Sequence, residues 1–398
     1  MNSALPLPPD QVKPPALQAE IGLILTGGGA RAAYQVGVLQ AISEMLPPGA
    51  RNPFPIICGT SAGAINATAL AVSATRFHEG VKQLSSVWEN FHVHQVYRAD
   101  PLGAFGNSAR WAASFLLNTV GNGQAVSLLD NAPLAELLKD KLPFKGIARS
   151  IHTGALRALS ISASGYTSGQ SVTFFQGAES VTPWRRARRI GIAAQIGVEH
   201  LMASSAIPLL FPAVKLNREY FGDGSMRQVA PISPALHLGA EKVLVIGVKR
   251  SVDTPPQRAH DPCYPPLAQI AGHVMSSIFL DSLDMDLERL QRINRTVGLI
   301  SPEARAQNGM TLKHIEVMVI SPSEEINAIA ERYAGTLPRT LRVLFRAIGA
   351  KGAAGAALLS YVLFEAPFCH ALIELGHRDT MARKEEVLKF LGGRADKV

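Results

Sequence analysis

The stretch that most constrains this chain is a serine between two glycines, within residues 55–66. A short apolar run predicts the end of a buried strand, and the small residues from Ala62 onward predict a helix. Between them, Gly59-Thr-Ser61-Ala-Gly63 has the G-x-S-x-G pattern of a nucleophile elbow. Flanking glycines there allow a turn sharp enough to present the serine hydroxyl at a helix N-terminus. The pattern predicts Ser61 as a nucleophile; a tight turn with an N-capping serine is the alternative.

A glycine-rich loop precedes this elbow. The apolar residues 21–26 predict a strand that runs directly into Gly27-Gly28-Gly29-Ala-Arg31, and residues 32–45 have helical spacing. Strand, loop, helix and the next strand then form a β-α-β unit of the kind that builds parallel sheets. The amides of Gly27, Gly28 and Gly29 could point at the oxygen that becomes negative when Ser61 attacks a carbonyl. Arg31 could add positive charge beside them.

The same loop has a second interpretation. Gly27-x-Gly29-x-x-Ala32 after a strand also fits the dinucleotide-binding fingerprint of an oxidoreductase. That fold needs an acidic residue about 20 positions onward, at the end of the second strand, to bind the ribose hydroxyls. The second strand ends instead in Cys58-Gly59, and Glu44 lies within the preceding helix. The sequence therefore favours the hydrolase interpretation, because that interpretation uses both glycine motifs.

A candidate base comes later in the chain. A strand-like segment, residues 213–221, leads into Gly222-Asp223-Gly224-Ser225, and Asp223 is followed by glycine. An Asp-Gly pair ordinarily marks a hairpin turn, which is the alternative to a catalytic role. Further strands are predicted at residues 158–163 and 171–175, paired as a hairpin, and at residues 241–248.

The composition of the chain and its Pro-rich segments suggest the domain organisation. With 398 residues, 47% hydrophobic and 18% charged, the chain is long enough for one enzyme core plus an added lobe. Residues 1–19 form a Pro-rich arm that has neither the pattern of a signal peptide nor that of a helix. We expect a catalytic domain over residues 20–250 and a mainly helical extension over residues 251–398. The longest apolar tract, Gly352 to Phe364, is too short to cross a bilayer.

In the extension, one predicted helix carries an apolar stripe along one side. Its acidic residues fall largely off that stripe, as expected for a solvated face: Asp281, Asp284, Asp286 and Glu288. We expect no metal site there and no cofactor elsewhere.

The basic character of the chain suggests an anionic partner. The formal net charge is +8, and residues 184–189 read Trp-Arg-Arg-Ala-Arg-Arg. Such a run is usually a solvated helix face; the alternative is a patch for phosphate head groups of an anionic membrane. We expect no nucleic-acid partner. The three cysteines lack C-x-x-C spacing, which favours a reducing compartment.

Taken together, these motifs resemble the patatin-like phospholipases. Gly27 to Arg31 is similar to the oxyanion loop of that family, Gly59 to Gly63 to its elbow, residues 203–212 to a motif before the base, and Asp223-Gly224 to its catalytic aspartate. The resemblance covers about residues 20–250, with the motifs in the order of the family. It implies a three-layer α/β/α core with a mainly parallel sheet, and a Ser-Asp dyad without metal or catalytic histidine.

Two positions depart from the family pattern. The loop has Ala32 where glycine is usual, and Asp223-Gly is followed by Ser225 where glycine or alanine is commoner. A methyl group at position 32 either narrows the loop or is harmless because that residue is already helical.

We therefore expect an esterase of the cytoplasm, peripherally associated with membranes, that cleaves acyl esters of phospholipids or related lipids. Ser61 would attack the ester and Asp223 would accept its proton. A weak base such as a carboxylate needs burial to raise its pKa, so Asp223 should lie in a desolvated pocket. The alternatives are a catalytically silent lipid-binding scaffold of the same fold and, less favoured, the dinucleotide-binding oxidoreductase.

Overall fold

The computed structural model of the chain describes residues 20–98, 127–250, 266–310, 312–347 and 352–392, together with Tyr264 and Gly349. The strands within these ranges are β1 Ile21–Leu25, β2 Ile56–Thr60, β3 Ala158–Gly165, β4 Ser171–Gly177, β5 Trp184–Arg186, β6 Arg189–Ala193, β7 Val214–Leu216, β8 Glu219–Asp223, β9 Lys242–Ile246 and β10 Glu316–Ile320.

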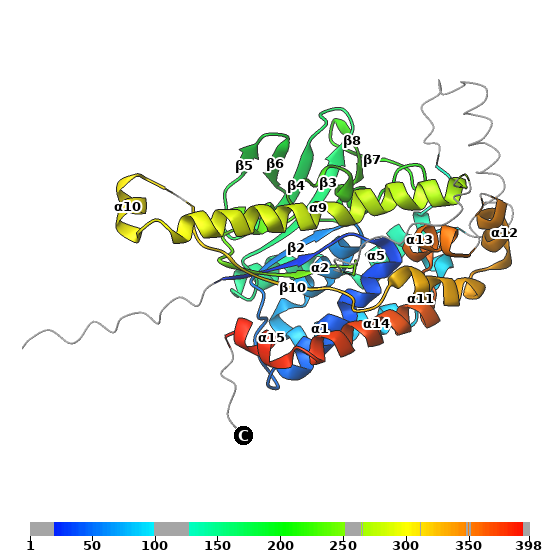
Figure 1. Cartoon of the computed structure of the whole chain (residues 1–398), viewed down its shortest axis with the longest axis horizontal. Helices are drawn as coiled ribbons and strands as arrows, with labels where there is room; N and C mark the ends of the chain where they lie inside the picture. The colour runs from blue at the N-terminus through cyan, green and yellow to red at the C-terminus, as the bar shows by residue number, and fades with distance from the viewer. Residues whose placement is uncertain are drawn as a thin grey trace, which may run out of the picture.

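These ten described strands form one mixed sheet (Figure 1). Its main path runs β10-β9-β1-β2-β3-β4-β6-β5, with β8 beside β3 and β7 beside β8. The first five strands along this path are parallel, whereas the pairs β3–β4, β3–β8, β5–β6 and β7–β8 are antiparallel. The parallel half therefore carries the β-α-β unit that the sequence predicts.

Helices cover both faces of the sheet. They are α1 Ala33–Met45, α2 Ala62–Val72, α3 Phe77–Glu89, α5 Ala132–Lys141, α6 Lys145–His152, α7 Val198–Ser204, α8 Ser233–His237, α9 Leu267–Gly298, α10 Pro302–Gln307, α11 Ile326–Tyr333, α12 Arg339–Ala347, α13 Gly352–Val362, α14 Ala366–Met381 and α15 Lys384–Phe390. Short 3-10 turns are η1 Gly29–Ala32, η2 Ala74–Arg76, η3 Val93–Gln95, η4 Gly224–Arg227 and η5 Ala334–Thr336.

Successive apolar residues of a central strand point to opposite faces of the sheet, and each face has its own hydrophobic core. In β1, Leu23 and Leu25 face the larger core, formed with α1, α2, α3 and α14. Ile24 faces the smaller core, which includes residues of α8 and α9. Because both faces are covered, these strands are continuous apolar runs without polar alternation, as buried parallel strands usually are. Helices on both faces of a central sheet give the three-layer α/β/α architecture predicted from the sequence.

The extension is integrated into this core. The sheet ends in β10, whose residues Glu316–Ile320 pair in parallel with β9, so the boundary expected at residue 250 falls between neighbouring strands of one sheet. On the other side, α14 packs along α1, where the Tyr34 hydroxyl lies 3.1 Å from an Asp379 oxygen. The same helix pair is joined by His377 and Glu44 at 2.8 Å. The described part of the extension therefore completes the fold.

Several local expectations are changed by the structure. The predicted strand over residues 213–221 is a hairpin of β7 and β8 that turns at Asn217, which has a φ of 53°. Asp223 therefore ends a strand and leads into η4, not into a hairpin turn. The hairpin predicted from residues 158–175 is present as β3 and β4.

The basic run lies on an edge hairpin, β5–β6, and not on a helix face. In α9, Asp286 is buried and accepts a hydrogen bond of 3.0 Å from the Ile232 amide, so it does not belong to a solvated face. The Pro-rich arm, residues 1–19, and Cys263 lie outside the described residues.

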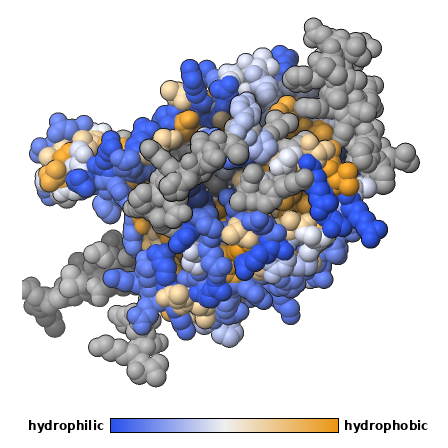
Figure 2. Space-filling view, turned by 45° about the vertical axis from the view of Figure 1, so that its right-hand side comes forward, coloured by the Kyte–Doolittle hydropathy of each residue, from blue (hydrophilic) through white to orange (hydrophobic). Residues whose placement is uncertain are grey.

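The surface is mostly polar on the face that Figure 2 shows, with the larger apolar groups towards its right-hand side. Within the described residues, no single helix is both long and apolar enough to cross a membrane. Gly355–Val362 and Ala366–Met381 meet the criteria of length and composition only as a pair, and this pair is bent by 92°.

Candidate active site

Ser61 occupies the sharp turn between β2 and α2. Its backbone has φ 55° and ψ −130°, a conformation that L-residues rarely adopt, and the residue is almost fully buried. Strain of this kind persists only where the surroundings hold the backbone in place, and it occurs often at functional sites. The strand-turn-helix context that the G-x-S-x-G pattern requires is therefore present at Ser61.

The two flanking glycines are needed for close packing. A Cβ atom on Gly59 would lie 2.5 Å from the Cα atom of Ala64, inside the turn itself. A Cβ atom on Gly63 would lie 2.3 Å from the carbonyl oxygen of Leu25, at the end of β1. Since real Cβ atoms do not approach other atoms so closely, both positions require glycine, and the first turn of α2 can lie directly against the strand that precedes the glycine loop.

A second serine, Ser204, holds the elbow from the side. Its hydroxyl oxygen accepts a hydrogen bond of 2.8 Å from the Ser61 amide and donates one of 2.7 Å to the carbonyl oxygen of Ser162. Ser204 is fully buried at the end of α7, so this bridge ties the strained turn to β3. The only signal for it in the sequence is its position in the 203–212 motif, and the geometry now gives that motif a structural role.

Asp223 reaches Ser61 because both are placed along β3. Thr60, the last residue of β2, pairs with Ser162, and Asp223, the last residue of β8, pairs with Ala163. The opposite edge of β3 is occupied by β4 over the same residues, so β2 and β8 share one edge. Asp223 therefore follows Thr60 along that edge and lies beside the elbow.

The carboxylate of Asp223 is fully buried and has few partners. One oxygen, Oδ1, accepts a hydrogen bond of 2.9 Å from the Ser225 amide. The other, Oδ2, has no partner of good geometry among the described residues. Burial raises the pKa of Asp223 to about 6, although hydrogen bonding from Ser61 and Ser225 lowers it. The register along β3 places this carboxylate beside Ser61.

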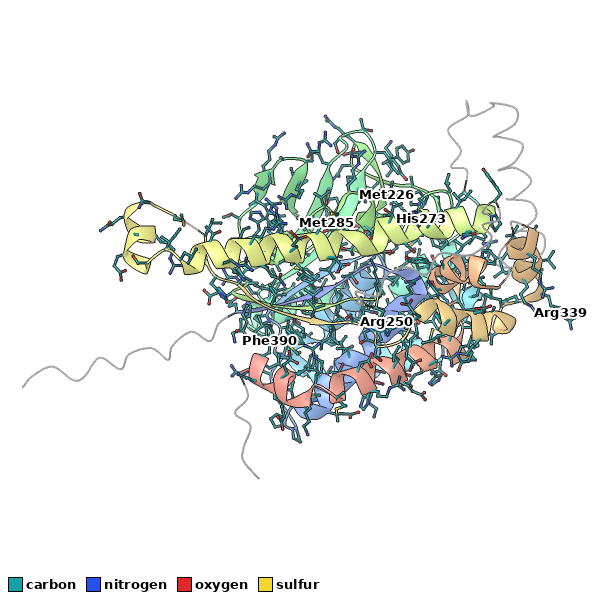
Figure 3. All side chains as sticks on the ribbon, viewed as in Figure 1. Met226, Arg250, His273, Met285, Arg339 and Phe390 are labelled. Atoms are coloured by element: carbon teal, nitrogen blue, oxygen red, sulfur yellow. The ribbon has the colours of Figure 1, made fainter. Side chains whose placement is uncertain are left out.

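Both departures from the family pattern lie in 3-10 turns beside the site. Ala32 lies in η1 with φ −65° and ψ −9°, so it is already helical and its methyl group leaves the loop conformation unchanged. Ser225 lies in η4, where its amide holds Asp223. Figure 3 shows the next residue of this turn, Met226, beside α9, and α9 also contacts η4.

The glycine loop lies between β1 and η1. Gly29 has a φ of 56°, in the left-handed region that glycine adopts without strain. Among the described residues, no group accepts a hydrogen bond from the amide of Gly27 or Gly28. Both N–H groups are therefore available to an oxygen that develops negative charge in the pocket.

A buried polar network supports this loop from behind. The Gln35 side chain donates to the Thr26 carbonyl oxygen at 2.8 Å, and Asn66 donates to Gln35 at 2.9 Å. Trp88 in turn donates its indole N–H to Asn66 at 2.8 Å. The chain of bonds runs from the start of the glycine loop through α1 and α2 to α3, so a satisfied buried network fixes the loop relative to the elbow.

Arg31 does not lie where the sequence interpretation placed it. Its guanidinium donates from Nε to the Ser360 hydroxyl at 2.8 Å and from Nη2 to Asn327 Oδ1 at 2.6 Å. It also lies 4.3 Å from the centre of the Tyr361 ring. Burial lowers the pKa of Arg31. The charged group is therefore held by Asn327 of α11 and Ser360 of α13.

A cavity of about 530 Å³ opens beside Ser61. Its walls come mainly from α2, α3 and α5, with Phe364 after α13, and they are largely apolar, including Ile65, Leu84 and Leu138. Gly29 and Ser205 lie with Ser61 at its polar part, and the Ser205 hydroxyl has no partner among the described residues. The cavity has the size and apolar lining typical of small-molecule sites.

No described contact links a histidine later in the chain to Ser61 or Asp223. His377 pairs with Glu44, and His237 is stacked on Trp184 at 4.9 Å between ring centres. Burial, with help from Arg186 and Arg189, lowers the pKa of His237 to about 4. The others in the described residues, His273, His314 and His370, are exposed, and His260 lies outside them. Figure 3 shows His273 on α9.

The Glu44–His377 pair also bears on the dinucleotide interpretation. Glu44 lies at the carboxyl end of α1, whereas a ribose ligand would need an acidic group at the carboxyl end of β2. The described site therefore consists of a serine elbow, a buried aspartate and a glycine loop beside an apolar cavity. It lies within a mixed α/β fold.

Comparison with models of protein families identifies the family of this chain. A sequence model of the patatin-like phospholipases matches residues 23–236, which is more than half of the chain and includes the glycine loop, Ser61 and Asp223. The chain belongs to the patatin-like phospholipase family, and its membership places it among the lipid hydrolases. A comparison with curated proteins gives no match.

Solved structures show weaker similarities. The chain is similar to VipD from Legionella pneumophila, with 12% sequence identity and a TM-score of 0.31, over 93% of this chain and 67% of that one. It is similar to the type III effector protein ExoU at 15% identity and a TM-score of 0.28, over 96% and 90% of the two chains. ExoU in complex with SpcU from Pseudomonas aeruginosa gives 15% identity and a TM-score of 0.26, over 94% and 80%. Similarities this distant have no bearing on substrate or partners.

Proposed function

We propose that this protein hydrolyses acyl esters of lipids with a Ser61–Asp223 dyad. Asp223 takes the proton of the Ser61 hydroxyl as the serine oxygen attacks the ester carbonyl carbon. The former carbonyl oxygen becomes negative and receives hydrogen bonds from the amides of the glycine loop. Collapse of this intermediate expels the alcohol, which takes its proton from Asp223. Water then attacks the acyl-serine, again with Asp223 as base. When the second intermediate collapses, the carboxylic acid leaves and Asp223 returns the proton to the Ser61 oxygen.

One observation carries this proposal: β3 places a buried carboxylate with a raised pKa beside the strained serine. An ordinary aspartate is a poor base at neutral pH because its pKa is near 3.9. A pKa of about 6 brings Asp223 much closer to the operating pH while leaving it mostly ionised at pH 7.

The cavity beside Ser61 suggests which part of the substrate lies there. Its largely apolar walls suit an acyl chain, and its polar part at Ser61 and Gly29 suits the ester. The exposed arginines of the β5–β6 hairpin could bring the protein to an anionic bilayer, where lipid esters are found.

Labelling with a fluorophosphonate probe tests the proposal. The probe should attach to Ser61, as read by mass spectrometry of peptides, and Ser61→Ala should remove the label. Activity should then appear on a panel of phospholipids and neutral acyl esters, with free fatty acid as the product. If the folded wild-type protein is neither labelled nor active on any member of the panel, the silent lipid-binding scaffold is the better description.

A further inference from the structure

The last turn of α13 lies directly against the glycine loop. The carbonyl oxygen of Tyr361 is so close to Gly29 that a Cβ atom there would lie 2.1 Å from it. Gly29 is also the loop residue with positive φ. Backbone therefore packs on backbone at this point, with no side chain between the extension and the loop that faces Ser61.

Arg31 fastens the same contact from behind. It is two residues beyond Gly29 in η1, and its buried guanidinium is held by Ser360 of α13 and Asn327 of α11. The Asn327 side-chain oxygen Oδ1 and the Ser360 hydroxyl are neutral acceptors, and Tyr361 supplies an aromatic face. A buried charge is costly unless such partners compensate for lost hydration, so Arg31 can occupy this place only while α11 and α13 are docked.

The end of α13 and the residues just after it reach the wall of the cavity. Phe364 is part of its wall and packs against Phe91, with 5.7 Å between the ring centres. The Val362 carbonyl oxygen accepts a hydrogen bond of 2.8 Å from the Tyr97 hydroxyl. Glu365 accepts a hydrogen bond of 3.3 Å from the Val93 amide. Residues 360–365 therefore contact both the glycine loop and the cavity wall.

We propose that Ser360 and Asn327 are positioning residues of the active site: through Arg31 they set the direction of the glycine-loop amides, so that the docked extension is required for acyl transfer. This proposal rests on the hydrolase function proposed above and assigns a role in it to the part of the chain outside the family match. The two residues do not touch the ester; they act through Arg31 and the backbone of the loop.

The proposal predicts a particular kinetic pattern. Hydrogen bonds from the loop strengthen as the oxyanion forms, and small displacements of such donors are costly to rate. Loss of an acceptor for Arg31 should therefore lower kcat by about 10- to 100-fold with KM changed little. A residue that merely stabilises the fold would lower the amount of active protein and leave kcat per folded molecule unchanged.

Two substitutions at one site make the matched comparison. Asn327→Asp keeps the oxygen that accepts from Arg31, whereas Asn327→Leu has a similar volume and no acceptor. Ser360→Ala removes the second acceptor with little change in volume. Ser85→Ala is the control, because Ser85 is also buried in a helix but, within the described part of the chain, its hydroxyl bonds only the Val81 carbonyl oxygen of its own helix.

Each variant is assayed in the full chain with a soluble p-nitrophenyl ester and with the fluorophosphonate probe, after circular dichroism shows that it is folded. We expect slow labelling and low kcat for Asn327→Leu and Ser360→Ala, and values within about twofold of wild type for Asn327→Asp and Ser85→Ala. If Asn327→Leu does not fold, Ser360→Ala decides the comparison.

Equal labelling rates in the wild type and Ser360→Ala would overturn this proposal while leaving the hydrolase function intact. A fall in kcat that disappears after correction for the folded fraction would overturn it as well. A folded wild-type protein that the probe does not label at Ser61 would overturn both proposals, so the two failures are distinguishable.

Discussion

Asp223 and Thr60 occupy consecutive positions along one edge of β3, opposite Ala163 and Ser162. The nucleophile elbow begins at the residue after Thr60, so this register alone brings a carboxylate from one strand to a serine from another. The two strands run in opposite directions, β2 parallel to β3 and β8 antiparallel to it, and their carboxyl ends therefore meet. The proposed dyad is thus a consequence of strand pairing, with β3 as the common neighbour.

The first prediction concerns the pH dependence of activity. Asp223 must be ionised to accept a proton from Ser61, and burial raises its pKa to about 6. We expect kcat/KM for a soluble ester to rise with pH through an apparent pKa near 6 and to level off above about pH 7. A profile that is flat between pH 5 and pH 7, in protein shown to be folded over that range, would exclude Asp223 as the base.

The second prediction concerns stability. The folded-state pKa of Asp223 lies about two units above that of an unfolded aspartate, so ionisation of Asp223 opposes folding by about 3 kcal/mol at pH 7. This penalty is absent below about pH 4, grows as pH rises to about 6 and is complete above that pH. Asp223→Asn removes the charge, so we expect the variant to be more stable than the wild type at pH 7 and nearly equal to it at pH 4. Urea unfolding at the two pH values measures the difference.

Such a variant would also be nearly inactive, which separates stability from function. An inactive Asp223→Asn protein that is also less stable at pH 7 would show that the carboxylate mainly supports the structure. Ser61→Ala is the companion variant, and because dyad members act as one unit, the double variant should be hardly worse than either single one.

The third prediction concerns the absence of a histidine relay. Alanine at His237 or His377 should leave kcat within about tenfold of wild type, since the described contacts of these side chains are with Trp184 and Glu44. His237→Ala removes a stacked ring and should lower the thermal midpoint, while His377→Ala should do so less. A loss of about 1,000-fold in kcat from either change, in folded protein, would establish a triad in place of the dyad.

Much of the candidate site could be predicted because the backbone conformation at each of its residues depends on neighbouring residues in the sequence. Ser61 and Asp223 are each marked by glycines, and those glycines are required where a chain turns sharply or approaches another closely. The strands β1 and β2 could be predicted because both of their faces are buried, which makes them continuous apolar runs. The glycine loop could be predicted because it follows such a strand.

What could not be predicted depends on partners distant in sequence. The acceptors of Arg31 lie 296 and 329 residues away, and no local pattern indicates that α11 and α13 pack there. The expectation of a solvated helix face for the basic run is wrong: the run has no apolar period that distinguishes a helix from a strand, and pairing of β6 with β4 places it in the sheet. β10 is a short strand within a helical region. It joins the sheet by pairing with the free edge of β9, a partner distant in sequence.

The fourth prediction concerns membrane contact at the β5–β6 hairpin. Arg185, Arg186 and Arg188 are exposed there, whereas Trp184 is stacked on Phe175 with 5.2 Å between ring centres. The arginines, at about 1 kcal/mol each, should supply the affinity for anionic vesicles, and the indole should contribute to stability. Changing the three arginines to serine should weaken binding to phosphatidylserine vesicles at low salt, and Trp184→Phe should not.

A second triple variant controls for net charge. Arg51, Arg295 and Arg346 are also exposed, and changing them to serine removes the same charge from other parts of the surface. Co-sedimentation with vesicles should be reduced for the hairpin variant and much less for the control. Equal losses would mean that the overall charge of +8, and not the hairpin, drives binding.

The last prediction concerns the glycine loop at Gly28. A Cβ atom there would lie 2.6 Å from the Cγ2 atom of Val248, which follows β9. The side chain of Val248 is short and branched, so its methyl group cannot move out of the way. The loop of Gly28→Ala must therefore shift, and its amides should no longer face the oxygen on the substrate. We expect a loss of about 100-fold in kcat with the fold retained.

The clash itself can be removed to test this cause. Val248→Ala deletes the methyl group in question, so the double variant Gly28→Ala/Val248→Ala should recover a substantial part of the lost activity, while Val248→Ala alone should be near wild type. Gly298→Ala is the control, since nothing lies within 4 Å of a Cβ atom at that position. Steady-state kinetics on a soluble ester measures all four proteins. Full activity in folded Gly28→Ala would place the oxyanion site elsewhere, and a double variant no better than the single one would show that Val248 is not what displaces the loop.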